Sequence, residues 1–201
     1  MSSSRRLQKT RAEILDAAWD LVSVKGAEVS LQEIARAAGI SRQSVYDHFG
    51  SRGGLLMALV RRADDRFDIK NGLFSAFARA DPLERLDTSI DVWVDFVERI
   101  FPVATDLIRL RATDPDASAA WEDRMADLRS WLVVLTESLE KDRALGAGWT
   151  AQAAAEYLWA AFSVQMWGML TKECGWTADQ ARAVLRRTIR AALFSGSVAT
   201  Y

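Results

Sequence analysis

The sequence predicts an all-α fold. None of its 201 residues lie in a run that alternates apolar and polar side chains, which is the pattern of a half-buried strand. Apolar residues instead recur at spacings of three and four, and glycine, proline or capping residues separate the segments that carry this helical spacing. These observations predict about nine helices, divided between an N-terminal three-helix domain and a larger C-terminal helical domain.

The first helix is expected between about Leu7 and Lys25, and Gly26 provides its end. Apolar side chains follow one face of it, at Leu7, Ile14, Leu15, Ala18, Leu21 and Val22. Basic residues gather near its beginning, at Arg5, Arg6, Lys9 and Arg11. We expect these four residues to form a mobile arm, which is either a solvated tail or a contact for a polyanion.

Two short helices joined by a tight turn are expected over residues 30–49. Ser30 and Glu33 form a capping box, in which each side chain accepts a hydrogen bond from the backbone N–H of the other residue. Gly39 ends the first of these helices, since glycine takes a left-handed conformation without steric cost. Ser41 caps the second helix. The apolar positions are Leu31, Ile34, Ala35 and Ala38 on the first helix, Ile40 in the turn, and Val45 and Phe49 on the second.

The residue sizes in this pair of helices favour a close crossing. The small Ala35 lets the helices approach each other, and Val45 fills the gap between them. The second helix is then left facing outward, which is the arrangement by which a helix-turn-helix enters the DNA major groove.

The rest of the chain continues as helices. A fourth helix follows its cap, Ser51, and is expected to end near residues 70–72. Five more helices follow: one from Asp81-Pro82 that Pro102 interrupts, a short one over about 103–112, a long one from Asp114-Pro115 to the break at 146–148, and two over about 150–172 and 177–195.

Composition and charge restrict the class of protein. Hydrophobic residues make up 50 % of the chain, and its one cysteine, Cys174, excludes an intramolecular disulfide, so we expect a reducing compartment. No signal core or membrane-length apolar stretch is visible, so we expect a cytoplasmic protein without a membrane partner. Through Arg62 there are ten Lys and Arg against six Asp and Glu (net +4), whereas the remainder has sixteen against twenty-one (net −5). The basic third suits contact with phosphate.

The N-terminal third resembles the TetR family of bacterial transcription regulators. The resemblance rests on ILDAAWDLVSVKG at 14–26, SLQEIARAAGISRQSVYDHF at 30–49 and GSRGGLLMALV at 50–60, in this order and spacing. It implies a DNA-binding domain over residues 1–50 and a helical effector-binding and dimerisation domain over residues 51–201, in which 51–70 is the connecting helix. It also implies a homodimer that represses by binding a double-stranded DNA operator and releases it when a small molecule binds.

The chain departs from the family at two places. Arg52-Gly53 stands where members usually have a lysine followed by an acidic residue, and the glycine pair Gly53-Gly54 weakens the start of the fourth helix. Gln43 occupies a place where the family often has a small residue, which suggests an additional side chain that reads bases.

A recognition helix in the major groove presents its N-terminal residues to base edges. We therefore expect Arg42 to read guanine and Gln43 to read adenine. Contacts with the DNA backbone are expected from Ser30, Ser44, Tyr46, His48 and Arg52. Simpler roles stay open, because Tyr46 and His48 also suit packing, and exposed polar residues occur on any short helix.

The C-terminal two thirds are rich in aromatic side chains, which line pockets for small apolar or aromatic molecules. The candidate effector contacts are Trp93, Phe96, Phe101, Trp121, Trp131, Trp159, Phe162 and Gln165. Aromatic residues at helical spacing more often belong to a protein core, so each of these residues taken singly is more often core than ligand contact. The acidic balance of this part of the chain favours a neutral or cationic effector.

The last two helices carry apolar stripes that are broad for a monomer of this size. Their small residues allow close approach of another helix, so we expect a homodimer in which these helices form a four-helix bundle. The alternative is that one face of each helix packs on its own domain. The stripe positions are Ala151, Ala154, Leu158, Phe162, Gln165 and Met169 on the first helix, and Ala178, Ala181, Val184, Leu185, Thr188, Ile189 and Ala192 on the second.

An all-α enzyme and a helical adaptor that only dimerises are the alternative functions. The single histidine and cysteine have no metal-ligand spacing, and no glycine-rich phosphate loop occurs. We therefore expect no enzymatic activity, metal or cofactor. An adaptor would need neither the basic first third nor an outward-facing Arg42-Gln43 pair, and salt-dependent binding to DNA would separate it from a regulator.

Overall fold

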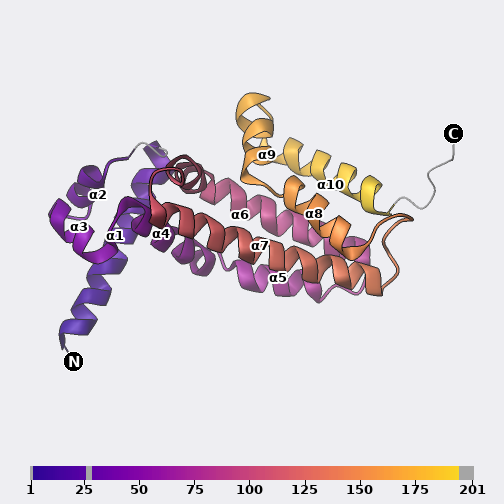
Figure 1. Cartoon of the computed structure of the whole chain (residues 1–201), viewed down its shortest axis with the longest axis horizontal. Coiled ribbons are helices and arrows are strands. Elements are labelled where there is room, and N and C mark those ends of the chain that lie inside the picture. Colours follow the sequence, from indigo (N-terminus) through magenta and orange to yellow (C-terminus); the bar gives the residue numbers. More distant parts are fainter. Residues whose placement is uncertain (1, 26–28, 195–201) are drawn as a thin grey trace. The chain divides into compact units, whose positions relative to one another are not determined.

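The computed structural model describes residues 2–25 and 29–194, except for the side chains of residues 2–10. Ten α-helices and one short π-helix form this part of the chain, and no strand occurs in it (Figure 1). The all-α class is therefore confirmed. None of the helices in the described ranges is long and apolar enough to cross a membrane.

The helices pack into two compact units. The first unit comprises Met1–Phe67 and Arg99–Arg124, and the second comprises Asp68–Glu98 and Met125–Tyr201. Two long helices, α6 (Pro82–Leu110) and α7 (Pro115–Lys141), contribute residues to both units. The predicted boundary at residue 50 separates two functional domains, not two compact units, and it stays a prediction.

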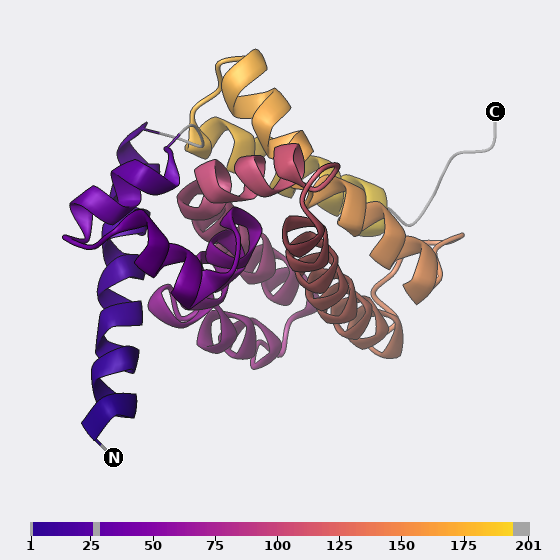
Figure 2. The same cartoon turned by 60° about the vertical axis from the view of Figure 1, so that its left-hand side comes forward.

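The first unit is built on four helices, which are α1 (Ser2–Lys25), α2 (Leu31–Ala37), α3 (Arg42–Phe49) and α4 (Arg52–Arg66). Helix α1 contacts α2 and α4, and α3 contacts α2 and α4, an arrangement that can be followed from a second direction in Figure 2. Apolar side chains from all four helices are buried together, among them Ile14, Ile34, Val45 and Leu59. The helical spacing predicted that Ile14, Ile34 and Val45 face inward. Burial of their apolar area drives the packing of the four helices.

Helix α1 begins earlier than expected. It starts at Ser2 rather than near Leu7, and its predicted end, Gly26, lies outside the described residues. Arg11 is not part of a mobile arm, because its guanidinium donates a hydrogen bond to the His48 carbonyl and lies 4.4 Å from the centre of the Phe49 ring. The predicted arm residues Arg5, Arg6 and Lys9 follow the backbone of α1, and their side chains are outside the described part.

The second unit contains α5 (Ile69–Phe77), α8 (Ala151–Ala161), α9 (Val164–Gly168), the π-helix η1 (Met169–Glu173) and α10 (Ala178–Phe194), with residues 82–98 of α6 and 125–141 of α7. Helix α5 was not predicted. Gly72, at the predicted end of the fourth helix, lies inside α5, where an added Cβ would come within 3.2 Å of the Val92 side chain. Glycine at this position permits a close approach to α6, and it does not end the helix.

Helix α6 runs through Pro102, so the predicted interruption and the separate helix over 103–112 are wrong. Proline in a helix interior removes one backbone hydrogen bond and costs about 3 kcal/mol. Apolar residues on both sides of the proline, including Val97, Ile100, Val103 and Leu107, are buried. Their continuous stripe outweighs the lost hydrogen bond, because most helix stability in proteins comes from packing of the apolar face.

The helix predicted over 150–172 is divided in two. Helix α8 ends at Ala161, and the Ser163 hydroxyl accepts a hydrogen bond from the Met166 N–H at 3.1 Å, which caps α9. A serine that caps a new helix competes with continuation of the old one. The apolar spacing of this segment is the same on both sides of Ser163, so spacing alone could not reveal the break.

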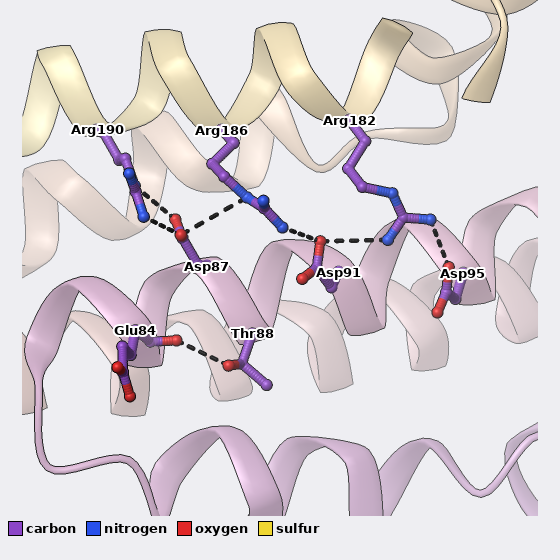
Figure 3. Close-up of polar contacts among 8 residues, drawn as sticks. All are labelled: Glu84, Asp87, Thr88, Asp91, Asp95, Arg182, Arg186 and Arg190. Atoms are coloured by element: carbon purple, nitrogen blue, oxygen red, sulfur yellow. Dashed lines mark hydrogen bonds and ion pairs between the residues drawn. The ribbon is translucent and has the colours of Figure 1, made fainter. Parts of the chain in front are cut away.

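Six charged side chains join α10 to α6 within the second unit (Figure 3). Arg182 bonds to Asp91 at 3.2 Å and to Asp95 at 2.5 Å. Arg186 pairs with Asp91 and Asp87, and the Arg190 Nε donates to Asp87 at 2.7 Å. Each set repeats every four residues, so each lies on one face of its helix. We refer to these six residues as the α6–α10 ion pairs.

Candidate nucleic-acid interface

The ends of the two helices in residues 30–49 are set by the capping residues and the glycine that the sequence predicted. The Ser30 hydroxyl accepts the Glu33 N–H at 3.2 Å, and the Glu33 carboxylate accepts the Ser30 N–H at 2.9 Å, which completes the capping box of α2. Gly39 has a φ of 70°, in the left-handed region, and the Ser41 hydroxyl caps α3 by accepting the Ser44 N–H at 3.0 Å. The ends of both helices are therefore defined by side-chain hydrogen bonds.

Glu33 is also the residue whose ionisation the capping box controls. The Ser30 backbone N–H, the Lys25 ammonium and the Ser30 hydroxyl hold the pKa of its carboxyl at about 2. Lys25 lies at the end of α1, 2.9 Å from a Glu33 carboxylate oxygen. The start of α2 is therefore tied to α1 by a charge that persists well below neutral pH.

Helix α3 has one buried and one exposed face. Val45 and Phe49 are buried, as predicted, whereas Arg42 and Gln43 are exposed. Ile40 in the preceding turn is only half-buried, although it was predicted to be buried, because one side of this short turn stays open to solvent. The exposed face of α3 carries the side chains that the sequence assigned to base reading.

The two candidate base readers are held in pairs along α3. The Arg42 guanidinium donates a hydrogen bond to the Tyr46 hydroxyl at 3.1 Å and lies 5.4 Å from the centre of its ring. The Gln43 amide donates to Asp47 at 2.9 Å. Both pairs have the spacing of one helical turn, at which neighbouring side chains meet. These contacts restrict Arg42 and Gln43 to the outward face before any partner binds.

Four of the predicted backbone contacts lie on or next to α2 and α3, which contact each other. Ser30 is exposed at the start of α2, and the Ser44 hydroxyl lies 2.9 Å from that of Ser41 at the start of α3. Tyr46 and His48 are half-buried on α3, and the His48 ring lies 6.1 Å from that of Phe49. Their hydroxyls and imidazole suit hydrogen bonds with phosphate oxygens.

Arg52, the remaining predicted contact, is placed differently. Its guanidinium bonds to Asp106 on α6, where Nε donates at 3.0 Å, and it also donates to the backbone carbonyl of Val29. Asp106 is buried and also accepts from Arg109 at 2.7 Å. We refer to Arg52, Asp106 and Arg109 as the Asp106 cluster. The arginine is thus engaged inside the first unit in the absence of DNA, and its contact with the DNA backbone stays a prediction.

The glycine pair at the start of α4 has a steric explanation that the sequence did not reveal. A Cβ on Gly53 would lie 2.3 Å from the Ala117 nitrogen, and one on Gly54 would lie 2.1 Å from the Phe49 carbonyl oxygen. Real Cβ atoms do not approach backbone atoms so closely. The first turn of α4 is therefore packed directly between the end of α3 and the start of α7, and the glycines permit this packing at the expense of helix propensity.

The predicted effector contacts gather only in part. Trp93 stacks on Phe162 at 5.0 Å between ring centres and meets Trp167 edge-on at 6.0 Å, and Trp131 lies 5.9 Å from Phe162. These four rings from α6, α7 and the α8–α9 region form an aromatic cluster in the second unit. Trp167, another of the aromatic residues in which the C-terminal part is rich, lies on α9, beyond the break after α8.

The other candidates lie apart from the aromatic cluster or at its surface. Phe101 and Trp121 belong to the first unit, where the Arg111 guanidinium lies 5.6 Å from the Trp121 ring. Phe96 is half-buried and Gln165 is exposed. Trp159 is half-buried beneath Arg129 at 4.5 Å, and the indole N–H groups of Trp159 and Trp131 are buried without a hydrogen-bond partner. A buried donor without an acceptor is costly, so these two groups are suited to a ligand oxygen or nitrogen.

Comparisons with known proteins agree with the family resemblance of the N-terminal third. The model of the tetR family of bacterial regulatory proteins matches residues 14–59. The HTH-type transcriptional regulator AlkX of Mycobacterium tuberculosis is 46 % identical over 57 residues, which are 28 % of this chain and 27 % of AlkX. The HTH-type transcriptional repressor BepR of Brucella suis is 29 % identical over 161 residues, 76 % of each chain. The resemblance predicted from the sequence is confirmed.

A solved structure shows that the likeness in fold extends over nearly the whole chain. A putative transcriptional regulator from Saccharomonospora viridis, crystallised in complex with choline, superposes with a TM-score of 0.76 at 20 % identity and covers 94 % of this chain and 99 % of its own. The match with AlkX, in contrast, spans about a quarter of that relative and lies within 28 % of this chain. The family model matches residues 14–59 only, and this range contains the helix-turn-helix.

Proposed function

We propose that this chain, whose N-terminal domain belongs to the TetR family of bacterial regulatory proteins, is a cytoplasmic transcriptional repressor that binds an operator as a homodimer and releases it when a small molecule binds. The observation that carries the proposal is the exposed face of α3. Arg42 and Gln43 point outward from a helix whose other face is buried and whose start is capped. This is how a recognition helix is presented to the major groove.

Base reading would follow from an exchange of partners on α3. Arg42 leaves the Tyr46 hydroxyl and donates two hydrogen bonds to guanine, and Gln43 leaves Asp47 and pairs with adenine. The freed Tyr46 hydroxyl then bonds to phosphate, together with Ser30, Ser44 and His48. Each well-formed base contact contributes about 1–3 kcal/mol of discrimination against the wrong base.

The proposed homodimer uses the last helices, through those predicted stripe positions that their own unit leaves open. Ala181, Leu185 and Ile189 of α10 and Ala154 and Leu158 of α8 are buried in their own unit, so these stripe positions form the protein core. The positions left at least partly open are Val184, Thr188 and Ala192 on α10, and Gln165, Met166 and Met169 beyond α8. Met166 and Met169 are exposed large apolar side chains, which favours burial by a second copy.

Effector binding is proposed for the aromatic cluster of the second unit. Its rings offer apolar faces, and the buried indole N–H group of one of them, Trp131, has no hydrogen-bond partner. A small molecule with a flat apolar or aromatic body and a hydrogen-bond acceptor would satisfy both features. The Saccharomonospora viridis protein was crystallised with choline, and aromatic rings also bind such quaternary ammonium groups.

Release of the operator requires that the effector bind better to the form of the dimer that does not fit DNA. In a two-fold dimer the recognition helices must lie about 34–36 Å apart to enter successive major grooves. An effector that favours another separation shifts the population away from the DNA-binding form, typically with a coupling of about 1–3 kcal/mol.

The proposal is tested by isolating genomic DNA fragments that the purified full-length protein retains, and by sequencing them. We expect one short palindromic site, with half-sites about one helical turn apart, and an affinity that falls steeply as salt rises because phosphate contacts release counterions. Addition of a small molecule that binds to the second unit should weaken this affinity for DNA. Retention of no DNA, or of unrelated fragments with equal affinity, would contradict the proposal.

A further inference from the structure

We infer that Asp106 and Asp114 are positioning residues for DNA binding: through Arg52 and Gly53 they hold the first turn of α4, and with it both helices of the helix-turn-helix. The inference rests on the proposed function, but it names residues of α6 and of the α6–α7 turn to which neither the sequence nor the relatives assign a role in DNA binding. All of the contacts concerned lie within the first unit.

The Asp106 cluster reaches the start of α2. The Arg52 guanidinium bonds at once to the Asp106 carboxylate and to the Val29 carbonyl. Val29 is buried and immediately precedes Ser30, the N-cap of α2. One planar guanidinium with donors in fixed directions therefore relates the backbone before α2 to α6.

Asp114 and the Gly53-Gly54 pair reach the end of α3. One Asp114 oxygen caps α7 by accepting the N–H groups of Asp116 and Ala117 at 3.0 and 3.1 Å, and the other accepts the Gly53 N–H at 3.2 Å. The absence of a side chain on Gly54 lets α4 lie against the Phe49 carbonyl, where α3 ends. A single turn of α4 thus separates the recognition helix from the start of α7.

These contacts make the orientation of α3 depend on α6 and α7. The buried Asp106 carboxylate has charged partners on two sides, and a backbone-to-backbone approach such as that at Gly53 leaves little room for adjustment. If this packing is altered, α2 and α3 keep their own caps and core but lose the contacts, through α4, with α6 and α7 that fix their orientation. DNA affinity should then fall without loss of the fold.

The deciding variant replaces the charge pair with apolar residues, Arg52→Met with Asp106→Leu. An apolar pair of similar volume often restores the stability that a buried ion pair provides, but it cannot bond to the Val29 carbonyl. We expect the double variant to melt within a few degrees of the wild type and yet to bind a short duplex carrying the recovered operator about tenfold more weakly. Hydrogen exchange of the α2 and α3 amides should be faster than in the wild type.

A second variant tests the steric contact and has a matched control. Gly53→Ala places a Cβ against the Ala117 backbone, whereas Gly72→Ala makes the same change in α5, where only the Val92 side chain must move. We expect Gly53→Ala to weaken operator binding about tenfold and Gly72→Ala to leave it unchanged.

The two proposals fail in different ways. If the wild type binds no DNA, the proposed function is wrong, and hydrogen exchange of α2 and α3 in the double variant still decides whether the cluster positions them. If the wild type binds and both the double variant and Gly53→Ala match it in affinity and exchange, the positioning inference is overturned. If the double variant loses affinity only in proportion to lost folded protein, a purely structural role is shown and the inference is equally overturned.

Discussion

Two sets of contacts in this molecule are made by the same types of side chain, arginine and aspartate, but differ in how deeply the aspartates are buried. The Asp106 cluster is centred on a carboxylate inside the first unit: the Asp106 side chain is 0 % exposed, that of Arg52 is 19 % exposed and that of Arg109 is 60 % exposed. The α6–α10 ion pairs of the second unit contain no fully buried carboxylate, since their aspartate side chains range from 16 % exposed at Asp87 to 55 % at Asp95. Each set joins helices that are distant in the sequence.

The difference between the two sets lies in what water can replace. Around Asp106, a lost partner leaves a fully buried carboxylate with one charged partner fewer and no water to replace it, so substitutions in the cluster should be strongly destabilising. Along α6 and α10, water and neighbouring arginines compensate for a lost partner. Each ion pair therefore contributes little to the free energy of unfolding. Burial therefore makes the first set a determinant of orientation and leaves the second as a modest support for helix packing.

The largest effect is expected from Asp106→Ala. This substitution removes the carboxylate that pairs with the largely enclosed Arg52 guanidinium, whose side chain is 19 % exposed, and it should lower the free energy of unfolding by about 3–5 kcal/mol. Denaturant unfolding of the purified variant measures the change. Asp95→Ala serves as the control, since the Asp95 side chain is 55 % exposed. Equal losses of stability for the two variants would contradict the role assigned to the burial of Asp106.

A smaller loss is expected from Asp91→Asn, which removes a charge that pairs with both Arg182 and Arg186. At this exposure we expect about 0.2–1 kcal/mol, because solvent screens the pairs. Partial burial lowers the pKa of Arg182, but the hydrogen bonds that it donates to Asp95 and Asp91 outweigh this and raise the pKa above its ordinary value; Asp95 remains in the variant, so the arginine stays charged. A loss of several kcal/mol would show that the α6–α10 ion pairs act as a buried network.

Salt should act on only one of the two sets. In 1 M salt the Debye length is about 3 Å, so the stability difference between the wild type and Asp91→Asn should shrink to a few tenths of a kcal/mol or less. The difference for Asp106→Ala should persist. Thermal unfolding of the three proteins at low and high salt measures both responses, and a parallel decrease would contradict the contrast in burial.

The smallest effect concerns a third carboxylate, Glu33, which is exposed but bonded to backbone. Its pKa of about 2 lies below the ordinary 4.5, so its contribution to stability is complete above pH 4.5 and disappears as the pH falls toward 2. Lys25→Met should leave the pKa below its ordinary value, because the Ser30 N–H is the larger cause. NMR titration of Glu33 tests this, and a return to 4.5 would assign the shift to Lys25 instead.

The contacts that the sequence predicted correctly are local. The capping box of Ser30 with Glu33, the left-handed Gly39 and the buried pair Val45 and Phe49 all depend on residues within one or two turns of each other. Their chemistry is visible at short spacing, and this is why the helix-turn-helix could be described before its structure was known.

The contacts that escaped prediction join distant segments. Arg52 and Asp106 are 54 residues apart, and no periodicity relates them, so Arg52 was assigned to phosphate on its position alone. Gly53 was interpreted as a weak point in a helix because propensity is local, whereas the backbone of Ala117 that it meets is not. The stripes on the last two helices were visible, but spacing cannot distinguish a core face such as that of Leu158 and Leu185 from a dimer face.

The central claim is that the exposed face of α3 reads base pairs, and Arg42→Ala tests it most directly. The affinities of the wild type and the variant are measured for the recovered operator and for duplexes in which each base pair of a half-site is replaced in turn. The account predicts that the variant loses about 1–3 kcal/mol of discrimination at one guanine in each half-site and keeps it elsewhere. An identical discrimination profile for both proteins would contradict it.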